Sequence, residues 1–342
     1  LFILAAARPL LYDRRPDWLQ ELQQHLRLDL RPLARRENRI LVYEILKLAD
    51  DVPAVLRDLI VENSQGNPFY VEELVKMLID EGAIVKGEDS WRIHFENLAA
   101  LHVPPTLTGI VQARLDGLEA VQKAILQTAA VIGRVFWDGA LLYINHHAQD
   151  PLHSDEIQQA LIGLRQRELI FKRTLTNFSH SIEYTFNHTI LREVAYESVL
   201  LRNRSLYHGL TADWLRAQSG ERSVGMVGLT ADHLIKAGRS EEAFVDLHLA
   251  GQQAAARFAN EEAKAYFSRA LNLAPASDVD AHFQLLQDRE AVFDMLGSRE
   301  EQEADLENLE EIARSLGAEE MAEVSLRRAT FEEATADYEA MI

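Results

Sequence analysis

After Gly220 the chain consists almost entirely of helix-periodic segments joined by very short turns, and this pattern restricts the fold more than any other feature of the sequence. The turn signals are Ala237-Gly238, Ala259-Asn260, Pro275-Ala276, Gly297-Ser298 and Gly317-Ala318. Connections this short bring each helix back alongside the one before it. They predict a row of helical hairpins.

One segment of this row matches the small and large positions of a tetratricopeptide repeat (TPR). The matching residues are Gly251, Ala254, Ala263, Phe267, Ala270 and Pro275. Small residues at these places let paired helices approach closely, and stacked pairs bury a continuous core. We therefore expect residues 221–342 to form TPR-like helical repeats that bind a protein partner. Because such a stack needs neighbours and Ile342 falls within a helical pattern, we expect the natural chain to continue beyond it.

Negative charge is concentrated in the same region. The formal net charge is -19, and residues 221–342 hold 26 Asp and Glu against 11 Lys and Arg, whereas residues 1–220 hold 28 against 24. Repulsion between this negative charge and phosphate disfavours nucleic acid as a partner of the C-terminal part. The run from Glu300 to Glu311 is interpreted as a solvated helix face. Ser298 with Glu301 predicts a capping box at the start of that helix.

Other site classes find little support in the composition. The chain has no cysteine, which excludes disulfides and thiolate metal sites and favours the reducing cytoplasm. It has no apolar run of the roughly 20 residues that a membrane span needs. His146, His147 and His153 lack a metal-binding spacing, so we expect no metal site there.

The first 36 residues are interpreted as the end of an α/β core. Leu1 to Ala7 is an apolar run typical of a strand buried on both faces of a parallel sheet. It is not read as a signal peptide, because no basic segment precedes it. A helix is expected over Trp18–Leu26 and a short strand over Leu28–Leu33. Because the chain opens with Leu inside a strand, we expect its natural N-terminus to lie upstream.

Two further domains are expected before the repeats. Residues 37–100 predict a small helical domain that ends in a β-hairpin over Ala83–Phe95. Its helices are expected over Ile40–Leu48, Val52–Val61 and Phe69–Ile79. Residues 101–220 show the order helix, helix, helix, strand, helix of a winged-helix domain. There Ser154 is expected to cap the third helix, Ile182–Phe186 to form the strand and His188–Leu201 the closing helix.

In combination these patterns resemble the STAND class of AAA+-related signalling ATPases, in particular the bacterial members that carry tetratricopeptide repeats. The resemblance assigns residues 1–36 to the C-terminal end of the nucleotide-binding core, 37–100 to its helical lid and 101–220 to its winged helix. It implies a mainly α fold and a nucleotide-dependent signalling switch. It also implies ATP or ADP as cofactor, with Mg²⁺ and an effector domain supplied elsewhere in the parent protein.

Two motifs within the resemblance imply nucleotide contacts near the N-terminus. Ala6-Ala7-Arg8 is similar to the end of the family's fourth core strand, whose arginine senses the γ-phosphate; Ala6 stands where a threonine is usual. A guanidinium can meet a phosphate bidentately. Gly66-Asn67-Pro68 resembles the lid motif whose proline packs on adenine. Two structural alternatives stay open. Arg8 could be a solvated residue at the end of a strand, and Pro68 could simply occupy the first position of a helix.

The third implied contact is His188. It resembles the histidine of the methionine-histidine-aspartate motif, which contacts the β-phosphate of ADP, although Asn187 and Thr189 replace the Met and Asp. A helix start suits a phosphate, because the helix dipole and the imidazole N–H both favour it. A structural role for His188 stays open.

No G-x-x-x-x-G-K-[ST] loop occurs in the sequence, so no catalytic residue is assigned. We expect this fragment to lack the Walker A and B elements and its parent to be the ATP-binding switch. Two other functions stay open: a TPR scaffold without nucleotide, and a DNA-binding regulator. The regulator would read DNA through the helix expected over Ser154–Leu169, with a basic cluster of Arg165, Arg167, Lys172 and Arg173.

Overall fold

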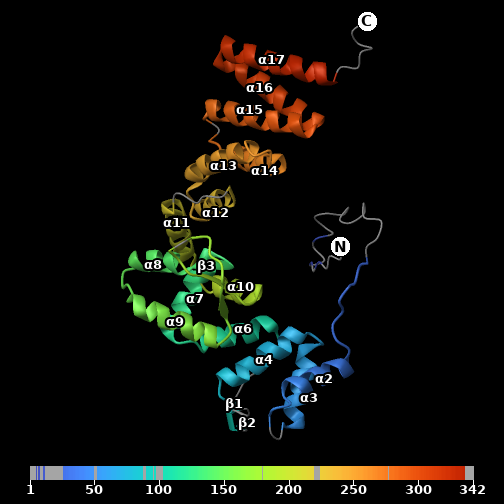
Figure 1. Cartoon of the computed structure of the whole chain (residues 1–342), viewed down its shortest axis with the longest axis vertical. Helices are drawn as coiled ribbons and strands as arrows, with labels where there is room; N and C mark the ends of the chain where they lie inside the picture. The colour runs from blue at the N-terminus through green and yellow to red at the C-terminus, as the bar shows by residue number, and fades with distance from the viewer. Residues whose placement is uncertain are drawn as a thin grey trace. The chain divides into compact units, whose positions relative to one another are not determined.

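The structure is a computed structural model that describes residues 26–49, 52–87, 90–94, 96–97, 103–178, 180–218, 224–275 and 277–335, with Ala5, Ala7 and Leu11. Most of the strand predicted over residues 1–7, nearly all of the helix predicted over 18–26, and Arg8 lie outside the described residues. The chain divides into two units, Leu1–Leu107 and Thr108–Ile342. The described part is mainly helical (Figure 1).

Within its described residues, the first unit has helices α2 (Arg35–Ile45), α3 (Ala54–Ser64) and α4 (Pro68–Asp80) and one hairpin, in the order that the sequence predicts. The strands β1 (Ile84–Lys86) and β2 (Trp91–Ile93) pair antiparallel, with Ile84 opposite Ile93. Fully buried apolar side chains such as Ile60 and Leu74 form the core.

The strand predicted over Leu28–Leu33 is wrong. These residues have no regular secondary structure, and Leu28 and Leu30 are 72% and 98% exposed. A strand is stabilised by the ladder it makes with a partner strand. Among the described residues this segment makes one backbone bond to the rest of the unit, from Leu33 N to Gly66 O at 2.8 Å.

The second unit begins with a helical layer on a small antiparallel sheet. The helices are α6 (Leu107–Asp116), α7 (Ala120–Ile132), α8 (Asp138–His146), α9 (Ser154–Gln166) and α10 (Thr189–Glu197). The strands are β3 (Val135–Trp137), β4 (Ile170–Lys172) and β5 (Glu183–Phe186), in the order β3-β5-β4. The sheet buries aromatic rings, with Phe136 stacked on Tyr184 at 5.6 Å. Strands β3 and β4 and helix α8 were not predicted.

Two local predictions in this region need correction. Ser154 is the first residue of α9 and does not cap it; instead the Glu156 carboxylate accepts a bond from His153 N at 2.8 Å. The helix predicted over His188–Leu201 is interrupted. Helix α10 ends at Glu197, and α11 (Leu201–Ala217) starts a new helix after a short turn. The apolar spacing continues through the turn, which is why the sequence alone did not show it.

Helices then follow one another to the end of the described chain. They are α11, α12 (Val224–Lys236), α13 (Ser240–Ala255), α14 (Asn260–Leu271), α15 (Val279–Leu296), α16 (Arg299–Leu316) and α17 (Ala318–Thr335). Each packs on the next, as Figure 1 shows. All five predicted turn dipeptides fall at the junctions between these helices, which confirms the row of hairpins.

Helices α13 and α14 approach each other closely at the predicted repeat. A Cβ placed on Gly251 would lie 2.4 Å from the Phe267 ring, so α13 and α14 can meet there only because position 251 has no side chain. Ala254, Ala263 and Ala270 are fully buried around the same contact. The small residues act as the sequence predicts.

Helix α16 confirms one prediction and corrects another. Ser298 occupies the N-cap position but makes no side-chain cap bond, so the predicted capping box is wrong. Its backbone oxygen instead accepts from Gln302 N at 3.0 Å. Most carboxylates between Glu300 and Glu311 are exposed, as predicted. Asp305 is the exception, because it is 1% exposed and paired with an arginine of α15.

Candidate functional site

The Gly66-Asn67-Pro68 motif forms the start of α4. The Asn67 side chain caps the helix by accepting from Phe69 N at 3.0 Å, and Pro68 occupies the first helical position. Gly66 has φ +79°, and a Cβ there would lie 2.2 Å from the Leu33 carbonyl oxygen. The glycine is therefore required by the backbone. The side chains of Asn67 and Pro68 remain exposed.

His188 is the N-cap residue of α10 and is half-buried. Its side chain does not cap the helix, while its backbone oxygen accepts from Leu191 N at 3.1 Å. The preceding Asn187 is fixed by two bonds, from its N to Leu169 O at 3.0 Å and from its Nδ2 to Glu168 O at 3.1 Å. The structure thus gives His188 a defined place at a helix N-terminus.

These predicted residues fall in different units. Gly66, Asn67 and Pro68 belong to the first unit and His188 to the second. Arg8 lies outside the described residues. The convergence of the three motifs on one nucleotide therefore stays a prediction.

A buried histidine pair that sequence reasoning missed lies at the other end of α10. Tyr196 Oη lies 3.0 Å from His208 Nε2, and His208 Nδ1 lies 2.8 Å from His233 Nδ1. His233 also bonds to the backbone of Ile132. The two imidazoles are 1% and 3% exposed. This chain of bonds, called the His208–His233 relay below, joins α7, α10, α11 and α12.

The direction of these bonds follows from their partners. Because the Ile132 carbonyl can only accept, the remaining nitrogen of His233, Nε2, must donate, and its Nδ1 must then accept from His208. His208 Nε2 in turn accepts from the Tyr196 hydroxyl. Burial is the main cause that lowers the pKa of His208 to about 3 and that of His233 to about 4. Both rings are neutral at neutral pH, and all four ring nitrogens are bonded.

Two guanidinium groups surround the tyrosine of this relay. Those of Arg192 and Arg204 each lie 4.7 Å from the Tyr196 ring centroid. Arg192 Nε donates to Ala130 O at 2.8 Å, and Arg204 Nε donates to Val199 O at 2.8 Å. Cation–π contact and backbone bonds fix the C-terminal half of α10 against α7 and α11.

A network of ion pairs holds the C-terminal end of α11 against the start of α13. Arg216 pairs with Glu242 and Asp246, and Arg239 pairs with Asp213 at 2.7 Å and with Glu242 at 2.5 Å. Hydrogen bonds from the two arginines lower the pKa of Glu242 to about 2. The network connects α11 to α13 across α12.

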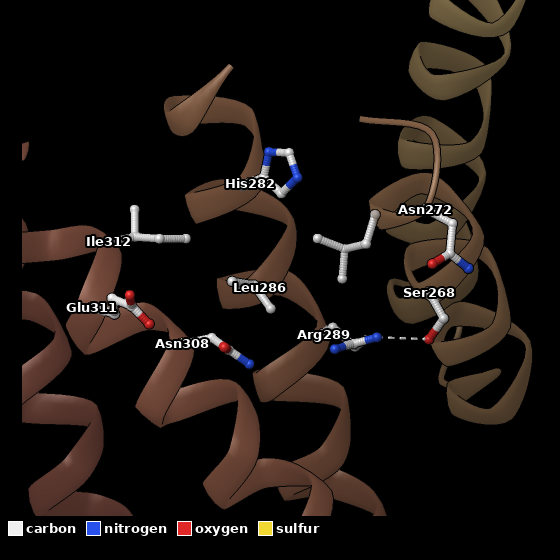
Figure 2. Close-up of a pocket in the computed structure, with 9 residues that line it drawn as sticks. Ser268, Asn272, His282, Leu286, Arg289, Asn308, Glu311 and Ile312 are labelled. Atoms are coloured by element: carbon white, nitrogen blue, oxygen red, sulfur yellow. Dashed lines mark hydrogen bonds between the residues drawn. The ribbon is translucent and has the colours of Figure 1, made fainter. Parts of the chain in front are cut away.

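A groove opens farther along the repeats, between α14, α15 and α16. It has a volume of about 370 Å³, and its lining includes the apolar side chains of Leu271, Leu286 and Ile312, which are called its floor below. The lining also includes polar side chains, among them His282, Asn308 and Glu311, which Figure 2 labels and which are called the rim below.

Arg289 lines this groove and makes hydrogen bonds within the protein through all three nitrogens of its guanidinium group. Arg289 donates from Nη1 to Ser268 Oγ at 3.0 Å, the dashed bond in Figure 2. Its Nε and Nη2 donate to the two carboxylate oxygens of Asp305, at 2.8 and 2.5 Å. Burial raises the pKa of Asp305, while the pair with Arg289 opposes that shift.

Two other features are absent from the described ranges. These ranges contain no group of three or more His, Asp or Glu side chains that could hold a metal ion. In the same ranges no helix has both the length and the apolar character needed to cross a membrane.

Comparison with known proteins gives few matches. No protein-family model matches the chain. An uncharacterised protein of Rhizobium meliloti (strain 1021) is 26% identical over 261 residues, which cover 75% of this chain and 24% of that protein. The chain thus spans about a quarter of the length of that relative.

Among solved structures, a Signal Transduction ATPase with Numerous Domains (STAND) protein with a tetratricopeptide repeat sensor, from Pyrococcus horikoshii, aligns with a TM-score of 0.39. The two are 12% identical, and the alignment covers 91% of this chain and 46% of that one.

Proposed function

We propose that this chain is the regulatory part of a nucleotide-dependent signalling switch of the STAND class, in which the helical repeats bind a protein partner. The observation that carries the proposal is the His208–His233 relay. The relay joins α12, the first helix of the repeat region, to α10, which has His188 at its N-terminus. A shift of α10 caused by a ligand at His188 would therefore also move or strain the contacts of α12 at the start of the repeats.

The nucleotide contacts in this proposal are few and local. Pro68 would pack on adenine, His188 would bond to a phosphate, and Arg8 would register the terminal phosphate. The exposure of Pro68 and the position of His188 at a helix N-terminus both fit an anionic nucleotide. The parent protein would supply the main phosphate-binding loop and the Mg²⁺ site for the bound ATP or ADP, because this sequence has no such loop.

The small sheet supports an intramolecular role for the domain that contains it. We propose that the order α7, β3, α8, α9, β4, β5, with its β3-β5-β4 sheet, forms the winged helix that the sequence predicts. Its α9 exposes acidic Asp155 and Glu156 as well as Arg165, and Arg173 is paired with Glu183 at 2.5 Å. Such mixed charge does not favour a phosphate backbone. We therefore propose a switch element in a cytoplasmic protein instead of a DNA reader.

Nucleotide can drive a switch only if ATP and ADP bind its two arrangements with different affinity. This is tested by hydrogen exchange on the full-length natural polypeptide that contains this chain, with ADP, with a non-hydrolysable ATP analogue and without nucleotide. We expect the amide protection of α10 to α13 to differ between the ADP and ATP forms. Identical protection in all three states would contradict the switch. Exchange in α16 serves as the internal reference, since it lies far along the chain from the relay.

A further inference from the structure

Helices α15 to α17 carry a large excess of negative charge with no available cation. Residues 279–335 contain 16 Asp and Glu, five Arg and no Lys. All five arginines take part in ion pairs within the described chain: Arg289–Asp305, Arg299–Asp294, Arg314–Glu310, Arg327–Glu290 and Arg328–Glu310. A field of this kind attracts cationic partners and repels acidic ones.

The rim of the α14–α16 groove presents hydrogen-bond acceptors. His282 Nδ1 lies 2.9 Å from Asp278 O, an acceptor, so Nδ1 carries the proton and Nε2 is left as an acceptor. Asn308 uses its Nδ2 to donate to Ala304 O at 2.8 Å, which leaves Oδ1 as an acceptor. Glu311 is exposed and has no ion pair among the described residues. The rim is therefore suited to donor groups.

Arg289, the one arginine or lysine among the described residues that line the groove, is already paired within the protein. The Nε, Nη1 and Nη2 atoms of Arg289 all donate within the protein. Releasing it would leave Asp305, which is 1% exposed, as a buried charge without its partner. An acidic ligand would therefore meet, among the described residues of the groove, only a guanidinium that is already paired with Asp305.

The floor sets the second requirement. Leu271, Leu286 and Ile312 come from three successive helices and line an open space of about 370 Å³. Pockets of this size suit an apolar side chain with polar groups around it. A ligand that matches both floor and rim carries an apolar residue next to a lysine or arginine.

We propose that the groove between α14, α15 and α16 docks a basic segment of a protein partner. An apolar side chain inserts between Leu271, Leu286 and Ile312, and a neighbouring lysine or arginine reaches Glu311. This inference rests on the proposed role of the repeats in partner binding. A second copy of the chain and a nucleic acid are disfavoured by the same negative charge.

The test measures fluorescence anisotropy of a labelled synthetic peptide with leucine at every fourth position and lysines between, added to the whole chain. The matched probe replaces every lysine by glutamate. The protein variants are Glu311→Gln at the groove and Glu319→Gln on α17, two exposed carboxylates with the same change of charge.

We expect the lysine peptide to bind and the glutamate peptide to fail. Glu311→Gln should weaken binding about two- to fivefold, as an exposed ion pair allows, and Glu319→Gln should leave it nearly unchanged. Replacing the leucines by serine should weaken binding at least about tenfold. Equal effects of the two protein variants, or binding of both peptides, would overturn the proposal.

Hydrogen exchange with the lysine peptide separates failure of the groove from failure of the repeat function. Protection on α14 to α16 supports the groove. Protection on other repeat helices overturns the groove and leaves partner binding by the repeats intact. Absence of protection on every repeat helix contradicts both, and self-association or duplex DNA binding would replace the basic peptide as occupant.

Discussion

Replacing Gly251 by alanine tests the close helix approach on which the first repeat depends. The added Cβ would lie 2.4, 2.6 and 2.9 Å from three atoms of the Phe267 ring. That ring is 1% exposed and lies in the cluster that includes Ala254 and Ala263, so it has little room to move. Real Cβ atoms do not come this close, and either the ring or the α13 backbone must shift.

The magnitude follows from two opposing terms. Alanine favours a helix over glycine by about 1 kcal/mol, whereas overpacking a filled core costs about 1–3 kcal/mol. A contact this short with a buried aromatic ring belongs in the upper part of that range. We therefore expect Gly251→Ala to lower the free energy of unfolding by about 1–2 kcal/mol.

Gly209 provides the matched control, since it is also a buried helical glycine. A Cβ there would lie 3.6 Å from Ala237 Cβ and 3.8 Å from Arg239 Nη1, which is ordinary contact. Gly209→Ala should therefore leave stability unchanged or raise it by up to about 1 kcal/mol. Urea unfolding followed by far-UV circular dichroism measures both. In the Phe267→Ala background the cost of Gly251→Ala should vanish. If both alanine variants stabilise the protein equally, the close approach is refuted.

Two further predictions concern buried polar pairs. The folded-state pKa values of His208 and His233, about 3 and about 4, lie below the unfolded value near 6.5, so the unfolded chain binds more protons as pH falls. Stability should therefore drop by about 2 kcal/mol per imidazole between pH 7 and pH 5, and a urea midpoint equal at both pH values would contradict the neutral pair. Arg289→Met should destabilise the repeats by about 3 kcal/mol because it leaves Asp305 buried without its partner. Adding Asp305→Leu should restore most of that loss, and thermal unfolding that shows no recovery would argue against the pair.

Local patterns were sufficient to predict much of the fold. Helix starts and ends follow turn signals such as Gly297 and Gly317, whose effect depends on the nearest residues alone. The short-range match at Gly251 and Phe267 likewise identified a helix pair in close contact. The hairpin in the first unit was found because its two arms flank a turn of four residues.

The parts that were missed depend on contacts distant in sequence or on very short elements. Strands β3 and β4 have three residues each, too few for a period-two signal. His208 and His233 lie on separate helices, and neither has a local pattern that marks it as half of a pair. A signal did exist, since a histidine on the apolar face of a helix needs a buried partner. The strand expected over Leu28–Leu33 had the right alternation but no partner strand among the described residues.

The release of ADP from the full-length natural polypeptide tests the central claim most directly. A fluorescent ADP analogue is chased with excess unlabelled ADP, and His188→Ala is compared with His146→Ala, an exposed histidine of α8. A hydrogen bond to a charged group contributes about 1.5–3 kcal/mol, so we expect release from the His188 variant to be roughly 10- to 100-fold faster. Release at the wild-type rate in the His188 variant, with ADP bound, would contradict the nucleotide switch.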